Sequence, residues 1–512
     1  MSNQRCLRMI SKYVLENKGG LRLNWGNGLK MAHILFLLRL PLAVLSFTLP
    51  LMLPSFIMAF FEPESGMAAV FGILIAALAL VSVPIFLSFK KSPLNLRARD
   101  GFFTVTLTWL FLSLYGALPY YFFGAPFDFT GAFFESASAF TSSGGTTLRD
   151  IEILPHSLLF WRSISYWIGG MGIIVLTVAL VPLLGAGGFQ LVKAESSGPD
   201  KEKITPKITG AAKTLWIFYG ALTLLAAALY WAGGMSVFDA VCHAFTTVST
   251  GGMSIKNKGL VHYDSAFITI VATVFMFLCA VNFNIYYRLI QRNIKDVFYN
   301  SELRAYILLT VTISLVIAFN ISGQYDTPFE AGRIAAFQTV AFISTSGTAI
   351  TDYTMWPPLS QALLVFALFL GGCSGSTAGG IKIIRHIVMF KQACNEMRRL
   401  VYPRGIFSVQ LNNKIGRKDV VYGVAGFIFV YMMTVLVAGL VTAAAGFDIV
   451  TSFTTALAVL GNSGSGFGLL GPENNFSIFP DYLKIFYALV MIAGRLELWT
   501  MLILFNREYW RA

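Results

Sequence analysis

The sequence predicts an all-α integral membrane protein in which four repeats of span, re-entrant loop and span surround a pseudo-four-fold axis. Two observations carry that prediction. The 512 residues are 56% hydrophobic and only 12% charged, with a mean hydropathy of +0.68, whereas soluble chains carry about 25% charged residues. A short run containing Ser or Thr and ending on glycine also recurs four times between apolar stretches.

About ten membrane spans are predicted, and the first two form an N-terminal hairpin around an acidic turn at 62–65. Nine runs lack Asp, Glu, Lys and Arg, and each can hold the ~20 residues that a helix needs to cross a bilayer. The tenth span, at 485–505, contains Arg495 and Glu497. The uncharged runs are 40–61, 66–89, 101–127, 163–192, 214–238, 265–287, 305–325, 353–381 and 420–447.

The formal charge of +13 follows the predicted topology and does not indicate a nucleic-acid partner. With both termini in the cytoplasm, the inner segments hold 31 of the 38 Lys and Arg residues, which is the positive-inside bias. No cleavable signal peptide is expected, because residues 1–30 are polar and basic and no short apolar region with a small-residue cleavage site follows. The five cysteines have no CxxC spacing, so neither a disulfide nor a structural metal site is predicted.

Each repeat contains a segment that begins with phenylalanine and an acid and is too short to cross a bilayer. Such a segment enters halfway and returns, which is tolerated where it lines a cavity or is buried in protein. The acid suits a helix N-terminus. The negative end of the helix dipole would then point towards the membrane centre and favour a cation. The pairs are Phe127-Asp128, Phe238-Asp239, Phe329-Glu330 and Phe447-Asp448.

The four glycine runs follow these segments, and their final glycines are 107, 96 and 117 residues apart. Four copies in one chain can form a ring without four subunits. A ring of carbonyls on glycine-permitted backbone can replace the water around a dehydrated potassium ion. Helix packing of small residues explains one run but not four in the same context. The predicted selectivity filter is Thr141, Ser142, Ser143, Gly144, Val248, Ser249, Thr250, Gly251, Ser344, Thr345, Ser346, Gly347, Gly461, Asn462, Ser463 and Gly464.

The repeats set the predicted domain boundaries. A cytoplasmic segment at 1–39 and the transmembrane hairpin at 40–100 precede four pore repeats, of which the first and third end in cytoplasmic linkers. The repeats are 101–212, 213–303, 304–418 and 419–512.

Two features outside the glycine runs stand out. Residues 371–380 contain five glycines, which should break the second span of the third repeat inside the membrane; close helix packing is the alternative. Lys382 follows directly, and either holds this segment electrostatically or extends to the cytoplasmic interface. Arg495 is costly inside a membrane and is expected to face a cavity or a partner. A pair with Glu497 is the alternative, although residues two apart do not face each other on a helix.

Two polar residues lie in the short segments themselves. Glu135 stands nine residues before Gly144. It either bonds backbone behind the filter, as pore-helix support, or adds a negative field at the mouth. His243, in the second segment, is interpreted as a satisfied structural group and not as a proton relay.

These motifs resemble the potassium-translocating membrane subunit of the Trk/Ktr/HKT superfamily, and most closely its TrkH-type bacterial members. The resemblance covers nearly the whole chain from about residue 40. Tyr166 departs from it, because Gln is usual there. The resemblance is carried by TSSGGTTL at 141–148, FDAVCHAFTTVSTGG at 238–252, GGCSGSTAGGIKIIRHI at 371–387 and AGRLELWTMLILF at 493–505.

The resemblance implies potassium uptake across the bacterial inner membrane, with potassium as the permeant ion at the filter. It implies a homodimer in membrane lipid and a cytosolic TrkA-type nucleotide-binding regulatory subunit on the basic inner face. It leaves both an ion channel and a cation-coupled symporter open. The gate that it implies is an intramembrane loop, and the gating residues are Gly372, Gly375, Gly379, Gly380, Lys382 and Arg495.

Other functional classes fit the sequence less well. No clustered His, Asp and Glu set, HExxH, GxSxG or Walker-type sequence is present, so no enzymatic activity is expected and nucleotide control must come from a partner. Transporters of organic solutes usually show two repeat halves and not four loops. The alternative within cation transport is a sodium-coupled or less selective potassium/sodium transporter. Some plant relatives carry serine at the first filter glycine, so Gly144 favours potassium.

Overall fold

The computed structural model describes residues 44–89, 98–184, 208–412, 414–415 and 418–511, together with Leu38, Pro41 and Leu42. The predicted N-terminal segment and most of the linker after the first repeat lie outside these residues. Helices dominate the described part. Its strands form one short hairpin, in which β1 (Gln410–Leu411) pairs antiparallel with β2 (Lys414–Ile415).

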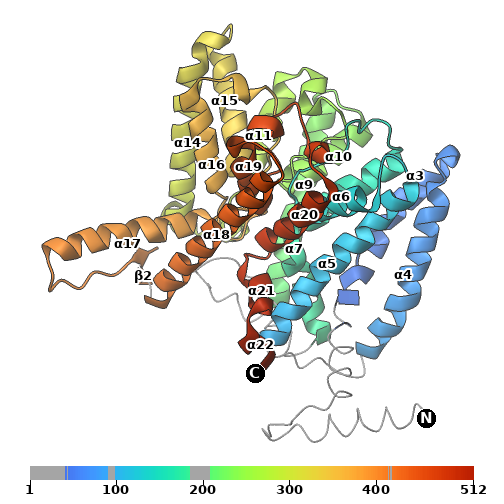
Figure 1. Cartoon of the computed structure of the whole chain (residues 1–512), viewed down its shortest axis with the longest axis horizontal. Helices are drawn as coiled ribbons and strands as arrows, with labels where there is room; N and C mark the ends of the chain where they lie inside the picture. Colours follow the sequence, from blue (N-terminus) through green and yellow to red (C-terminus); the bar gives the residue numbers. More distant parts are fainter. Residues whose placement is uncertain are drawn as a thin grey trace, which may run out of the picture.

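The described chain begins with a helical hairpin followed by four similar units (Figure 1). The hairpin joins α3 (Leu49–Phe60) to α4 (Met67–Phe89) through a short turn. Each unit then has a leading helix and a short pore helix. The leading helices are α5 (Ala98–Phe123), α9 (Ile208–Ala232), α14 (Ser301–Ile321) and α18 (Lys418–Ala444), and the pore helices are α6 (Phe129–Thr141), α10 (Val237–Val248), α15 (Pro328–Ile343) and α19 (Ile449–Leu460).

A trailing helix completes each unit, and all four trailing helices are interrupted. In the first, Gly172 has non-helical dihedrals (φ 66°, ψ 169°); the second and fourth bend by 87° and 111°. The third stops for residues 370–382, as the glycine-rich segment predicts. The trailing helices are α7 (His156–Leu184), α11 (Ala266–Cys279) with α12 (Phe283–Ile290), α16 (Pro358–Phe369) with α17 (Ile383–Val401), and α20 (Asp481–Arg495) with α21 (Trp499–Leu502).

These interruptions decide which helices can span a membrane without a break. In the part of the chain that the structure describes, four unbroken helices are long and apolar enough, and they are the four leading helices. Two trailing helices qualify as bent pairs. The uncharged runs of the sequence correctly predict where apolar helices lie. They do not predict the bends, because a bend inside an uncharged run leaves the charge pattern unchanged.

Polar side chains cap the outer ends of the pore helices, where the sequence places an acid. Asp128 and Asp448 are themselves the N-caps, and accept from amides three residues later at 2.6 and 3.0 Å. In the second and third pore helices a hydroxyl residue is the cap, Ser236 and Thr327, and the acid lies in the first turn. Since N-caps and first-turn acids both stabilise a helix start, the Phe-acid pattern marks all four pore helices.

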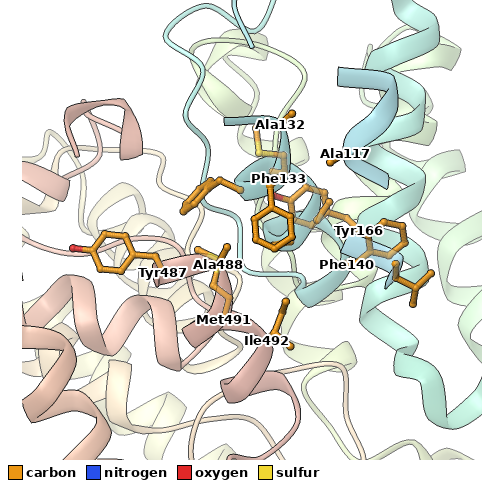
Figure 2. Close-up of a cluster of buried hydrophobic side chains, with 14 of the residues drawn as sticks. Ala117, Ala132, Phe133, Phe140, Tyr166, Tyr487, Ala488, Met491 and Ile492 are labelled. Atoms are coloured by element: carbon orange, nitrogen blue, oxygen red, sulfur yellow. The ribbon is translucent and has the colours of Figure 1, made fainter. Parts of the chain in front are cut away.

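The four units close into a ring. Each leading helix packs on its own pore helix, and each trailing helix packs on the pore helix of the next unit: α7 on α10, α11 on α15, α16 on α19, and α20 on α6. The last of these contacts joins the end of the chain to its beginning. Figure 2 shows part of the buried apolar cluster in this region, which includes Phe133 and Phe140 of α6 and Met491 and Ile492 of α20.

Candidate ion filter and gate

Each pore helix ends in a loop of the same backbone conformation. These glycine loops are residues 142–145, 250–253, 345–348 and 462–465. In each, the first and third residues are left-handed, and the third is glycine, which reaches this conformation without a steric penalty. The left-handed pairs are Ser142 and Gly144, Thr250 and Gly252, Thr345 and Gly347, and Asn462 and Gly464, with φ between 53° and 77°.

The structure moves the predicted glycine run at 248–251 by one residue. The amide of Gly251 donates to the carbonyl five residues earlier at 2.8 Å, and the amide of Ser463 in the fourth loop makes the same bond at 2.8 Å. Gly251 is therefore the counterpart of Ser463, and Gly252 takes the place of the final glycine. The prediction was wrong in register because this run ends in two adjacent glycines. Val248 belongs to the last turn of α10.

The glycine loops form a closed ring in which each final glycine faces a carbonyl of another repeat. A Cβ added to Gly144 would lie 2.7 Å from the carbonyl oxygen of Gly251. At the other three glycines it would lie closer still. The carbonyl always belongs to the residue before the glycine of the next repeat, and the fourth repeat meets the first. The contacts run from Gly144 to Gly251, Gly252 to Ser346, Gly347 to Ser463 and Gly464 to Ser143.

This ring presents backbone oxygens from four equivalent positions, with no room for a side chain at the glycines. Carbonyl rings of this kind can replace the hydration shell of a cation. Because only backbone atoms form the ring, the four runs can differ in side chains and still present the same surface.

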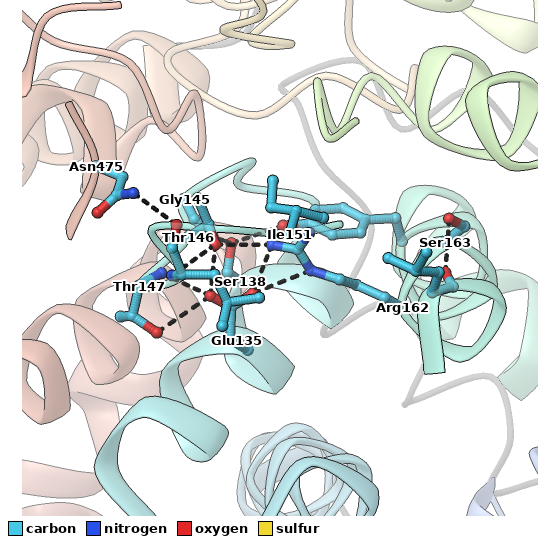
Figure 3. Close-up of polar contacts among 12 residues, drawn as sticks. Glu135, Ser138, Gly145, Thr146, Thr147, Ile151, Arg162, Ser163 and Asn475 are labelled. Atoms are coloured by element: carbon cyan, nitrogen blue, oxygen red, sulfur yellow. Dashed lines mark hydrogen bonds and ion pairs between the residues drawn. The ribbon is translucent and has the colours of Figure 1, made fainter. Parts of the chain in front are cut away.

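A buried ion pair supports the first glycine loop (Figure 3). The side chains of Glu135 and Arg162 are 0% and 1% exposed, and Arg162 Nη2 lies 2.7 Å from Glu135 Oε2. The other carboxylate oxygen accepts from the amide of Thr147 at 2.6 Å and from the hydroxyl of Thr146 at 2.7 Å. Glu135 therefore bonds the backbone directly after the loop, and the pair ties this segment to both α6 and α7.

Different side chains stand at the corresponding position of the next two repeats, nine residues before the final glycine. His243 Nε2 lies 3.0 Å from Ser254 Oγ, and Nδ1 lies 2.8 Å from the carbonyl of Asp239. Gln338 donates to the carbonyl of Thr348 at 3.4 Å. Both ring nitrogens of His243 thus have partners, as expected for a structural histidine.

Tyr166 packs against two glycine loops at once. Its hydroxyl lies 3.0 Å from Ser138 Oγ, which donates to the carbonyl of Gly145 at 2.7 Å. A Cβ on Gly251 would lie 2.5 Å from the tyrosine ring. Tyr166, the residue at which this sequence departs from the resemblance described above, therefore lies directly behind the ring of carbonyls.

The segment between α16 and α17, residues 370–382, lies against the glycine loops. We call it the α16–α17 loop. The amide of Gly379 donates to Thr345 Oγ1 at 2.6 Å, and Thr250 Oγ1 lies 3.2 Å from Thr377 Oγ1. Two of the glycine loops are therefore in hydrogen-bond contact with this segment.

Close packing explains why the α16–α17 loop needs glycine. A Cβ on Gly379 would lie 3.0 Å from the Cβ of Asn462 in the fourth glycine loop, and a Cβ on Gly372 would lie 2.6 Å from that of Ala378. Gly375 and Gly380 are left-handed, with φ of 72° and 65°. The predicted glycines therefore serve close approach and backbone conformation, and not packing between two regular helices.

Further bonds fix both ends of the α16–α17 loop. The Glu302 carboxylate, at the start of α14, accepts from the amide of Ser374 at 2.7 Å and from the amide of Ile384 at 3.2 Å. The Lys382 ammonium donates to the carbonyl of Ala378 within the loop, and Lys382 is only 5% exposed. Lys382 therefore bonds within the loop, which agrees with the first of the two roles considered for it.

Arg495 ends α20 and joins the α16–α17 loop to the first trailing helix. Its Nη1 donates to the carbonyl of Thr377 at 2.8 Å, and its Nη2 donates to the carbonyls of Gly169 and Gly170 at 2.6 and 2.8 Å. Glu497 does not define this geometry, because its carboxylate pairs with Arg385.

A cavity lies where these groups meet. Four elements line it: α5, the interruption of α7, the α16–α17 loop and the end of α20. Its lining residues include Trp109, Gly172, Ser376, Lys382, Arg495 and Glu497. Two cationic side chains thus face a space that adjoins the α16–α17 loop.

Sequence reasoning missed two charged residues of this region, Arg162 and Arg385, and considered Glu497 only as a partner of Arg495. Arg162 had a detectable signal, since it directly precedes an uncharged run and can reach an acid in the preceding pore helix. The pairing of Arg385 with Glu497 had no signal, because they are 112 residues apart and meet only through the bends in two trailing helices.

These features define a class: multi-pass helical membrane proteins whose four re-entrant loops meet in one ring within a single chain. Comparisons with known proteins agree. The model of the TrkH family, described as cation transport protein, matches residues 66–511. The Trk system potassium uptake protein TrkH of Salmonella typhimurium is 36% identical over 477 residues, covering 92% of this chain and 98% of the relative. The Escherichia coli protein TrkG is 36% identical over 474 residues, 90% of this chain and 95% of the relative.

A solved structure shows the same fold. The crystal structure of the potassium transporter TrkH from Vibrio parahaemolyticus matches 93% of this chain and 100% of its own, with a TM-score of 0.80 and 33% identity. The chain belongs to the TrkH family of cation transport proteins. The predicted superfamily and all-helical membrane fold are confirmed, and the chain is a transporter and not an enzyme.

Proposed function

We propose that this protein takes up potassium across the bacterial inner membrane through a selective, channel-like pore. The observation that carries the proposal is the closed ring, in which Ser143, Gly251, Ser346 and Ser463 place their carbonyls at equivalent positions against the final glycines. The relatives named above, which are called potassium uptake proteins or a potassium transporter, support potassium as the permeant ion. The four glycine loops are the filter, and Glu135 supports the first of them.

The α16–α17 loop is the gate in this proposal. It touches the filter through Thr250, Thr345 and Asn462. Arg495 fixes the gate against the first trailing helix and places a positive charge beside the cation pathway. Lys382 stabilises the loop from within. A cation can pass only when the loop leaves its contacts with the filter, so the same bonds that hold the loop set the resting conductance.

Partners and orientation complete the proposal. The chain is a homodimer in the inner membrane, its two termini are cytoplasmic, and a cytosolic nucleotide-binding subunit of the TrkA type controls the gate. The distribution of Lys and Arg supports this orientation. Helix α17 follows the gate directly and projects from the bundle (Figure 1). Its exposed Arg398 and Arg399 offer a basic surface to such a subunit.

Radioactive rubidium uptake tests the proposal, in cells that lack their own potassium uptake systems and express this chain with its cytosolic partner. Uptake that excess potassium blocks and excess sodium does not supports a selective potassium pathway. Equal block by sodium supports the less selective alternative. No uptake with the partner present contradicts the proposal.

A further inference from the structure

The fourth trailing helix contains a strained interruption. Glu497 and Leu498, between α20 and α21, are consecutive non-glycine residues with positive φ, of 56° and 58°. L-residues rarely adopt this conformation, because the Cβ crowds the following carbonyl. Such strain persists only where surrounding contacts impose it. Contacts around the bend must therefore hold it, and the bond from the amide of Leu498 to the carbonyl of Ala493 at 2.8 Å is one of them.

One charged contact reaches the bend from another repeat. The Glu497 carboxylate forms an ion pair with Arg385, in the first turn of α17. Arg385 is 6% exposed, and its guanidinium lies 3.7 Å from the ring centroid of Phe427 in α18. A cation above an aromatic face is attracted to it. The ring therefore fixes Arg385, and Arg385 fixes Glu497.

The same two segments also meet at the gate. Arg495, two residues before Glu497, donates to the carbonyl of Thr377 in the α16–α17 loop. That loop runs directly into α17, whose third residue is Arg385. The ion pair and the Arg495 bond are thus two links between the same pair of elements. Any displacement of α17 pulls on the bend through Glu497, and the bend positions Arg495.

We infer that Arg385 and Glu497 are a positioning pair that couples the orientation of α17 to the placement of Arg495 beside the ion pathway. The inference rests on the proposed function, in which Arg495 and the α16–α17 loop form the gate. Separation of the pair releases the bend towards regular helix and withdraws Arg495 from the Thr377 carbonyl. A cytosolic partner that moves α17 therefore acts on the gate through this pair.

The test compares the full chain with E497Q, R385Q and the double variant. E396Q is the matched control, because it removes an exposed ion pair with Arg399 on the same helix. The first readout is the rate at which N-ethylmaleimide modifies Cys373, followed by peptide mass spectrometry. Cys373 is fully buried in the α16–α17 loop, so its modification reports loop release without requiring ion transport.

The second readout is radioactive rubidium flux in proteoliposomes without the cytosolic partner. E497Q and R385Q should each raise the Cys373 modification rate and the flux by about 5- to 150-fold, the range of a typical coupling between sites. The double variant should do no more than R385Q alone, because R385Q already breaks the ion pair that E497Q breaks. Potassium-over-sodium selectivity should stay unchanged, and E396Q should match wild type.

Three results would overturn the inference: unchanged Cys373 modification in both single variants, effects that add in the double variant, or an equal effect of E396Q. A merely structural role predicts a lower unfolding temperature with reduced flux, and not faster modification with increased flux. Failure of the proposed function looks different. In that case no variant conducts rubidium, with or without the partner, while Cys373 modification still decides whether the pair holds the loop.

Discussion

Replacing Arg495 by glutamine should raise ion flux in the absence of the cytosolic partner. The arginine makes three hydrogen bonds to carbonyls, one on the α16–α17 loop and two on the first trailing helix. A hydrogen bond to a charged group contributes about 1.5–3 kcal/mol. Arg495 is partly exposed, so water takes the place of some of these hydrogen bonds in the variant. The net loss of free energy should therefore equal that of about one hydrogen bond.

A loss of about 1.5–3 kcal/mol shifts the ratio of released to bound loop by roughly 10- to 150-fold, since 1.4 kcal/mol is a factor of ten. Loss of the positive charge beside the pathway adds to this effect. Lysine at position 495 keeps the charge but not the planar fork of donors, so R495K should lie between wild type and R495Q.

The assay is radioactive rubidium flux into proteoliposomes that contain the purified chain alone. R149Q is the control, because Arg149 is an exposed arginine that donates to Ser477 at 3.4 Å and does not line the cavity. Flux through R495Q no greater than through wild type, at equal protein incorporation, would refute the reasoning that Arg495 restrains the loop.

Three further predictions concern the filter, its support and the gate. Gly252→Ala costs about 1–2 kcal/mol of left-handed strain and collides with a carbonyl of the third repeat. It should therefore lower potassium-over-sodium selectivity in flux competition, whereas Gly332→Ala, which meets no atom within 4 Å, should not. Glu135→Gln leaves Arg162 buried without a counter-charge, at about 3–5 kcal/mol; thermal unfolding should show a lower midpoint, and an unchanged midpoint would argue against the ion pair. Deletion of 374–378 should raise rubidium flux without the partner, and retained partner dependence would speak against a gate there.

The repeat architecture could be predicted from the sequence because it rests on local patterns. Uncharged runs identify apolar helices, and a phenylalanine followed by an acid marks each pore helix, where Asp128 and Asp448 are indeed caps. Glycine content also predicts the break before α17. Each of these signals lies within a few residues of the feature that it predicts. It can therefore be recognised without knowledge of the tertiary structure.

The remaining features depend on contacts between distant segments. The second glycine run has two candidate final glycines, and only the backbone hydrogen bonds of Gly251 assign the register. The bend after Arg495 contains no glycine or proline, so nothing local predicts it. Arg385 and Glu497 meet because two bends bring them together. Arg495 could be singled out because it is a charged residue inside the membrane. The sequence does not indicate its carbonyl partners, because they belong to two other repeats.

Because one chain supplies all four repeats of the ring, each repeat can change in sequence independently of the other three. In a symmetric tetramer, a change beside the axis is copied four times, so a buried acid and arginine behind one loop would appear as four such pairs around a narrow channel. Here the first quarter uses Glu135 with Arg162, while the second and third use His243 and Gln338 at the same place. Selection can therefore adjust rigidity or charge on one side of the ion path by single substitutions, and the asymmetry of this protein is a property on which such adjustment can act.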